Sequence, residues 1–212
     1  LGLILVLSRF QIRWSNRRYE VSRWLLAFSM FVLAGHFVLQ MACGFRAKGD
    51  EIGAVVNVLF YTPVSFIISY AVYSLVCYRS GRKKFALMGC VSYALILACF
   101  FFGYHDTPRG MHIGEWLYVM LALFAVTIIY CIYTTVIEMR YHRKIIEENT
   151  TEDLLPFDRY AYASYGMVGV LFLAMVGAIC YRPILYSVAP LMLFSLISFT
   201  ISFLGYGYNM IP

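Results

Sequence analysis

The sequence predicts an all-α integral membrane protein: a bundle of about seven transmembrane helices, with the N-terminus outside and the C-terminus in the cytoplasm. Hydrophobic residues make up 62% of the chain and charged residues 13%, and the mean hydropathy is +0.74. Soluble domains carry about 25% charged residues. The apolar residues also form blocks of about 20, the length that a helix needs to cross a bilayer. No stretch alternates between apolar and polar residues as the strands of a membrane barrel do.

Six apolar blocks are long enough to span, and a seventh is only partly present at the start of the chain. We therefore treat residues 1–212 as a single transmembrane helical domain, since only a helix or a closed barrel satisfies its backbone hydrogen bonds in lipid. The predicted spans are approximately 1–8 (partial), 24–43, 53–77, 85–104, 116–137, 161–180 and 184–205. Because the chain begins and stops beside apolar runs, we expect it to be part of a longer protein.

The distribution of basic residues predicts the orientation. Of the 17 Lys and Arg residues, thirteen lie in the segments 9–23, 78–84 and 138–160. The alternate segments carry only four: Arg46, Lys48, Arg109 and Arg182. Loops rich in Lys and Arg stay in the cytoplasm. This rule places the start of the chain outside and Pro212 in the cytoplasm.

The cytoplasmic segment 138–160 is the only long loop that the sequence predicts. Its mixed charges suggest that the preceding helix extends into the cytoplasm until Pro156 stops it, since a proline in the interior of a helix kinks or breaks that helix. His142 would then lie outside the membrane. The segment is either a solvated connector or a surface for a cytoplasmic partner.

Polar side chains inside the predicted spans mark the candidate ligand-binding residues, because such groups are costly in lipid. His36 and Gln40 share one face of the second span, and Asn57 and Tyr61 begin a polar row on the third. The row continues with Ser65 and Ser69. Pro63, which lies between Tyr61 and Ser65, can kink the helix in the middle of this row. A cavity lined by these groups would hold a small amphipathic ligand. The alternative is that the groups simply bond to one another between helices.

The sequence predicts no catalytic residue, no cofactor and no metal site, and we expect that the chain is not an enzyme. Hydrolase, kinase and nucleotide-binding motifs are missing. No charged residue lies near the centre of a span, which argues against a proton pump, and the last span lacks the lysine that retinal needs. The loop from His105 to Glu115 offers two histidines and two carboxylates, but their spacing fits no established zinc site. Direct contact with nucleic acid is not expected either.

Four segments resemble a known family. They are 44–54 (GFRAKGDEIGA), 56–63 (VNVLFYTP), 91–94 (VSYA) and 205–209 (GYGYN). Together they resemble the multi-pass membrane module of membrane-anchored transcriptional regulators from Bacteroides-type bacteria. The resemblance covers nearly the whole chain. It implies a location in the bacterial cytoplasmic (inner) membrane and a cytoplasmic output domain, often of the helix-turn-helix type, attached in cis after Pro212.

Two functions follow as hypotheses. In the first, the chain is a membrane-embedded sensor or anchor module for signal transduction and transcription regulation, in contact with the lipid bilayer and a small-molecule ligand. In the second, it is a small-solute transporter of the 3+1+3 helix type. Pro63 and Pro190 would then interrupt equivalent third and seventh helices, as paired interruptions do in transporters.

Overall fold

Nearly all of the chain that the structure describes is helical. The computed structural model describes residues 1–8, 17–45, 49–77, 81–106, 113–149, 155–180 and 183–209. In these ranges 94% of the residues are helical and none lies in a strand, which confirms the predicted all-helical architecture. The helices are α1 (Gly2–Leu7), α2 (Arg17–Cys43), α3 (Asp50–Val76), α4 (Arg82–Asp106), α5 (Trp116–Asn149), α6 (Leu155–Cys180) and α7 (Pro183–Asn209).

Five of these helices, α2 to α5 and α7, are long and apolar enough to cross a membrane. The other two differ. Helix α1 has six residues, and α6 contains a shorter apolar stretch, Tyr162–Gly177. The molecule therefore has the length and composition of a multi-pass membrane protein.

The helices extend beyond the predicted spans. Helix α2 begins at Arg17, α5 continues to Asn149, and α6 begins at Leu155. Within the predicted cytoplasmic segment 138–160, the described residues, 138–149 and 155–160, are all helical. We expected Pro156 to end the helix that precedes it. Instead, α5 ends at Asn149, and Pro156 is the second residue of α6. Proline suits this position because the first N–H groups of a helix have no partner within it.

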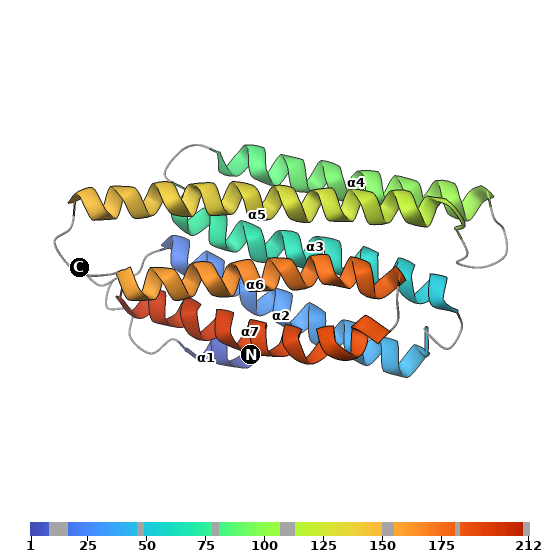
Figure 1. Ribbon diagram of the computed structural model, residues 1–212, viewed down its shortest axis with the longest axis horizontal. Helices are drawn as coiled ribbons and strands as arrows, with labels where there is room; N and C mark the ends of the chain where they lie inside the picture. Colours follow the sequence, from blue (N-terminus) through green and yellow to red (C-terminus); the bar gives the residue numbers. More distant parts are fainter. Residues whose placement is uncertain are drawn as a thin grey trace.

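Helix α3 lies at the centre of the bundle. The helices run along the long axis of the molecule, with α4 and α5 on one side of α3 and α2, α6 and α7 on the other (Figure 1). Helix α3 contacts α2, α4, α5 and α6, whereas α7 packs mainly on α6 and α1 on α2. In the most apolar stretch of α3, two-thirds of the residues are buried, whereas in that of α4 only 22% of the residues are buried.

The outer faces of the bundle are apolar. Helix α4 exposes large side chains from one end to the other: Leu87, Met88, Val91, Leu95, Phe101 and Phe102. Helices α2, α5 and α7 expose similar rows. Soluble monomers rarely expose apolar patches of more than a few hundred Å². A bilayer, in contrast, solvates such faces.

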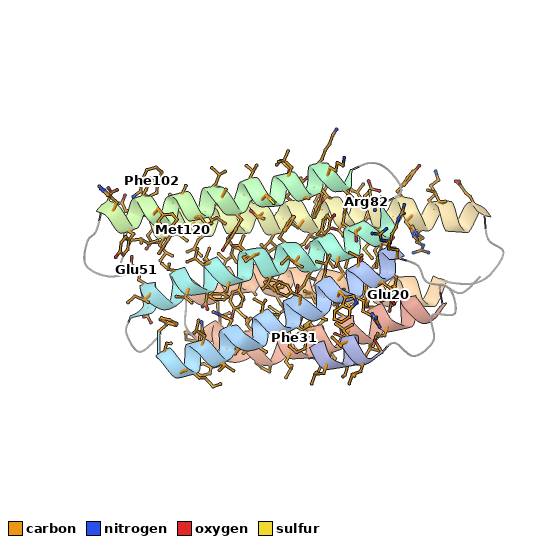
Figure 2. All side chains as sticks on the ribbon, turned by 180° about the vertical axis from the view of Figure 1, so that it is seen from behind. Glu20, Phe31, Glu51, Arg82, Phe102 and Met120 are labelled. Atoms are coloured by element: carbon orange, nitrogen blue, oxygen red, sulfur yellow. The ribbon has the colours of Figure 1, made fainter. Side chains whose placement is uncertain are left out.

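Basic residues are concentrated at one end of the long axis. All the Lys and Arg residues of the described ranges lie at this end, which we call the basic end: Arg17, Arg18, Arg23, Arg82, Lys83, Lys84, Arg140, Arg143, Lys144 and Arg159. Acidic residues lie at both ends: Glu20, Glu138 and Glu148 at the basic end, and Asp50, Glu51, Asp106 and Glu115 at the opposite end, which we call the acidic end. The other four basic residues, Arg46, Lys48, Arg109 and Arg182, lie outside the described residues. Figure 2 shows Arg82 and Glu51 toward opposite ends of the bundle.

Pro63 lies inside α3, where its missing N–H leaves the carbonyl of Leu59 without its usual helical donor. The hydroxyl of Tyr93 in α4 donates a hydrogen bond to this carbonyl, at 3.3 Å. In lipid a freed backbone group must find such a partner within the protein. The neighbouring helix therefore compensates for the proline.

Candidate functional site

Three of the predicted ligand-binding residues meet between α2 and α3, toward the acidic end. Nε2 of His36 lies 3.1 Å from Oδ1 of Asn57, and the amide nitrogen of Gln40 donates to the same oxygen. Because an amide oxygen only accepts hydrogen bonds, the contact requires the His36 proton on Nε2. His36 is 1% exposed and Asn57 3%.

Aromatic rings enclose this polar centre. The His36 ring stacks on Phe60, with centroids 4.7 Å apart, and meets the edge of Tyr61 at 5.1 Å. On its far side, Tyr61 meets Phe172 of α6 at 6.2 Å. We call His36, Gln40, Asn57, Phe60 and Tyr61 the His36 cluster. The His36 and Gln40 side chains already bond to Oδ1 of Asn57, so a ligand that took any of these three groups would have to replace those bonds.

Gln40 is the most accessible polar member of the His36 cluster, being half-buried. Exchanging its hydrogen bond for one to a ligand would disturb the packing least. Asn57 would then keep its contact with His36. The cluster can thus offer the Gln40 amide, inside an aromatic wall, to a small amphipathic molecule.

The predicted polar row on α3 divides between two places. Asn57 and Tyr61 belong to the His36 cluster, but Ser65 donates to the carbonyl of Thr62 in its own helix, at 3.0 Å. Ser69 bonds instead to Tyr165 of α6. The row drifts around the helix, so its far members face different neighbours.

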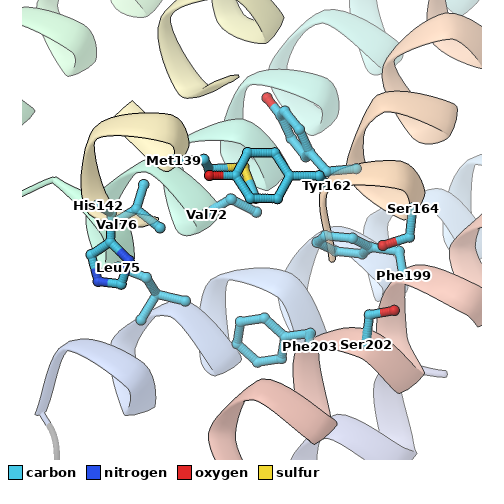
Figure 3. Close-up of a pocket in the computed structure, with 11 residues that line it drawn as sticks. Val72, Leu75, Val76, Met139, His142, Tyr162, Ser164, Phe199, Ser202 and Phe203 are labelled. Atoms are coloured by element: carbon cyan, nitrogen blue, oxygen red, sulfur yellow. The ribbon is translucent and has the colours of Figure 1, made fainter. Parts of the chain in front are cut away.

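A second polar region lies toward the basic end, between α3, α5, α6 and α7 (Figure 3). It is a cavity of about 40 Å³, which we call the Tyr165 cavity. It is lined by Val72, Leu75, Val76, Met139, His142, Tyr162, Ser164, Tyr165, Phe199, Ser202 and Phe203. Small-molecule pockets usually enclose about 300–1,000 Å³, whereas one water needs only about 10–15 Å³. The cavity has room for a few waters.

Tyr165 ties this region together. Its side chain is 2% exposed, and its hydroxyl donates to Oγ of Ser69 at 3.1 Å. The same hydroxyl lies 3.3 Å from the carbonyl oxygen of Cys131. One phenol on α6 thereby reaches both α3 and α5.

The sequence interpretation missed His142 and Tyr165. We expected His142 outside the membrane, on an extension of the preceding helix, and α5 does continue past it; its side chain, however, is buried, at 6% exposed. The spacing of Met139 and His142, three residues apart on a continuing helix, was the available signal, since such residues share a face. Tyr165 had no signal of its own among 18 tyrosines.

The acidic end uses its carboxylates structurally. Glu51, at the start of α3, accepts hydrogen bonds from the backbone N–H groups of Ile113 at 2.8 Å and Gly114 at 2.7 Å. Asp106 accepts one from the indole of Trp116 at 3.1 Å. These bonds hold the connection between α4 and α5 against α3. Residues 107–112 of the predicted outer loop, with His112, lie outside the described residues.

No family model, curated protein or solved structure matches the chain. Function is therefore argued from the two polar regions and from the helices that connect them.

Proposed function

We propose that the chain is the membrane-embedded sensor or anchor module of a bacterial signalling or transcriptional regulator. It would pass a signal to a cytoplasmic output domain after Pro212. The observation that carries the proposal is that α2 links the His36 cluster to α7, the helix that leads toward Pro212.

The link at the basic end is a single aromatic pair. Tyr19 of α2 stacks on Phe203 of α7, with centroids 4.9 Å apart and planes inclined by 11°. The Tyr19 hydroxyl also donates to the backbone carbonyl of Phe203, at 3.4 Å. His36 lies 17 residues after Tyr19 in the same helix, or about 25 Å at 1.5 Å per residue.

The mechanism would be a population shift. A ligand that bonds to His36 and Asn57 better in one packing of α2 against α3 stabilises that packing. Helix α2 would carry the shift to the Tyr19–Phe203 contact, and α7 would carry it to the output domain. Pro190 is a flexing point in α7.

The topology proposed with this function has seven crossings and a cytoplasmic basic end, in a bacterial inner membrane. Two facts support it. The described Lys and Arg residues lie at one end, as the positive-inside rule requires of a cytoplasmic face. Helix α6, with 26 residues, also extends about 39 Å, and its apolar stretch Tyr162–Gly177 covers about 24 Å of the hydrocarbon thickness of about 30 Å.

The test uses the intact protein and its target genes. We expect the open reading frame to continue past Pro212 into a DNA-binding domain, and a stop codon there would contradict the proposal. We also expect a His36→Ala, Asn57→Ala double variant to lose the transcriptional response. The matched control is Ser65→Ala with Ser195→Ala, because these hydroxyls bond only to carbonyls of their own helices in the described structure. A full response from the double variant would rule out the ligand site.

The alternative function is transport of a small solute by a 3+1+3 bundle. Pro63 in α3 and Pro190 in α7 are the observation that favours it. Their surroundings differ, however, because α3 is central and α7 packs mainly on α6. Solute flux by the purified chain in liposomes would support the transporter, and a regulatory response without flux would support the sensor.

A further inference from the structure

A groove at the basic end is separate from both polar regions. It has contributions from three helices: Arg17, Arg18 and Val21 of α2, Tyr70 and Ser74 of α3, and Arg82 of α4. Helices α2 and α4 both pack on α3, which forms the floor between them. The groove encloses about 370 Å³, against about 40 Å³ for the Tyr165 cavity. This volume is in the range of pockets that bind small molecules, about 300–1,000 Å³.

The groove is strongly cationic. Three of its six lining residues are arginines and none is acidic. The nearest acid in sequence, Glu20, is paired with Arg23 at 2.6 Å. In the part of the chain that the structure describes, no carboxylate forms an ion pair with Arg17 or Arg82. The first turns of α2 and α4 add the partial positive charge of a helix N-terminus.

The residue types suit an oxyanion such as a phosphate. Guanidinium groups bind phosphate through two parallel hydrogen bonds, which ammonium groups do not form. Tyr70 supplies one wall, held by ring contacts to Phe66 and Phe85. Ser74 already bonds to Ser22 and Ala71, so the arginines are the main donors.

Apolar surface continues away from the arginines. Val21 in the groove is 49% exposed, and Trp24 and Phe28 follow on α2 at 53% and 56%. On α4, Leu87 and Met88 are 63% and 46% exposed. A molecule with a phosphate at one end and hydrocarbon at the other would match both surfaces.

We propose that this groove binds the headgroup phosphate of an anionic phospholipid, with Arg17, Arg18 and Arg82 around the phosphate. The acyl chains lie along the apolar surfaces of α2 and α4. The inference rests on the membrane bundle alone, and it holds whether the chain senses, anchors or transports.

The test is lipid binding to the full chain in detergent, measured by native mass spectrometry. Phosphatidylglycerol and phosphatidylcholine with the same acyl chains are the two ligands. We expect tighter binding of phosphatidylglycerol. Each basic residue near a lipid headgroup contributes about fivefold in affinity, so an Arg17→Gln, Arg82→Gln variant should bind phosphatidylglycerol about 25-fold more weakly. Its affinity for phosphatidylcholine should fall less, because the cationic choline of that lipid offsets the charge of the phosphate.

The matched control is Lys84→Gln with Arg140→Gln. These two residues are exposed, lie at the same end and are outside the groove, so the loss of charge is equal. We expect a change of less than about twofold. An equal loss in both double variants would mean that the whole basic end attracts lipid and would overturn the groove site.

A third variant tests the groove without changing charge. Val21→Trp narrows the groove, and its exposed position tolerates a larger side chain. We expect weaker phosphatidylglycerol binding with unchanged helicity by circular dichroism. Wild-type affinity in this variant would overturn the proposal, even if the arginine variant failed to fold. Displacement of the lipid by millimolar inorganic phosphate would also overturn it, in favour of a free-phosphate site.

Discussion

The His36 cluster and the Tyr165 cavity both use α3, but they treat buried polar groups differently. In the His36 cluster, Asn57 receives hydrogen bonds from two side chains of α2, and aromatic rings fill the surrounding space. In the Tyr165 cavity, the phenol bonds across to Ser69, but about 40 Å³ remains open beside it. One region is closed by its own contacts and the other retains free volume.

This difference separates two possible roles in a conformational change. A closed cluster changes only when a ligand exchanges its hydrogen bonds, so it suits recognition. Free volume next to Phe199 and Phe203 lets these rings repack without a clash, so it suits transmission. The predictions below test whether the two regions differ in this way.

The largest effect is expected from Tyr165→Ala. The variant removes a buried ring and its link to Ser69, and truncation of a buried aromatic costs about 3–5 kcal/mol. The free energy of unfolding, measured by titration with sodium dodecyl sulfate, should fall by that amount. The control is Tyr186→Ala, at a residue 84% exposed, which should change stability by less than about 0.5 kcal/mol. A loss below about 1 kcal/mol at Tyr165 would show that the ring is not held by its cavity.

The next prediction compares how the free energy of unfolding changes when one methylene is added at each of two valines of α3. Val58 is fully buried, and Val72 lines the Tyr165 cavity. Val58→Ile should overpack the helix interface and destabilise by about 1–3 kcal/mol. Val72→Ile should fill free space and be neutral or stabilise by about 0.5 kcal/mol. Equal costs at the two positions, in the same unfolding titration, would mean that the regions are packed alike.

Asn57→Leu should lower the free energy of unfolding by about 1–2 kcal/mol. Leucine has a similar size but leaves both donors of α2 without their shared acceptor. Gln40→Leu should cost less, because Gln40 is half-buried and Asn57 keeps its contact with His36. If the two variants were equally destabilised, the His36–Asn57 contact would not be the stronger one.

The smallest effect concerns Pro63, which separates the two regions on α3. Tyr93→Phe removes the donor to the Leu59 carbonyl and should cost about 0.6 kcal/mol. In a Pro63→Ala background the new backbone N–H can bond to that carbonyl, so Tyr93→Phe should then cost almost nothing. A double-mutant cycle measures this coupling. Zero coupling would show that the tyrosine does not compensate for the proline.

Much of the fold could be predicted, because lipid requires long apolar helices and hydropathy detects them. The mixed charges of 138–160 predicted that the helix extends past its span, but its end at Asn149 could not be predicted, since hydropathy registers no change where a polar helix stops in water. The His36, Gln40 and Asn57 contact followed from the rarity of polar groups within spans. The role of Tyr165 could not be predicted: α6 has apolar residues on most of its surface, so its rotation toward α3 and α5 is not encoded in a hydrophobic stripe.

The central place of α3 has a consequence for biosynthesis. When α3 leaves the ribosome, α2 already precedes it, so Asn57 can meet His36 within a hairpin of two helices. Ser69 must wait for Tyr165, which follows 96 residues later. Neighbouring hydroxyls on α3 bond to their own backbone, as Thr62 does to Val58, and need no later helix. The His36 cluster is thus available early to the growing chain, whereas the Tyr165 cavity can close only after α6 and α7 have been made.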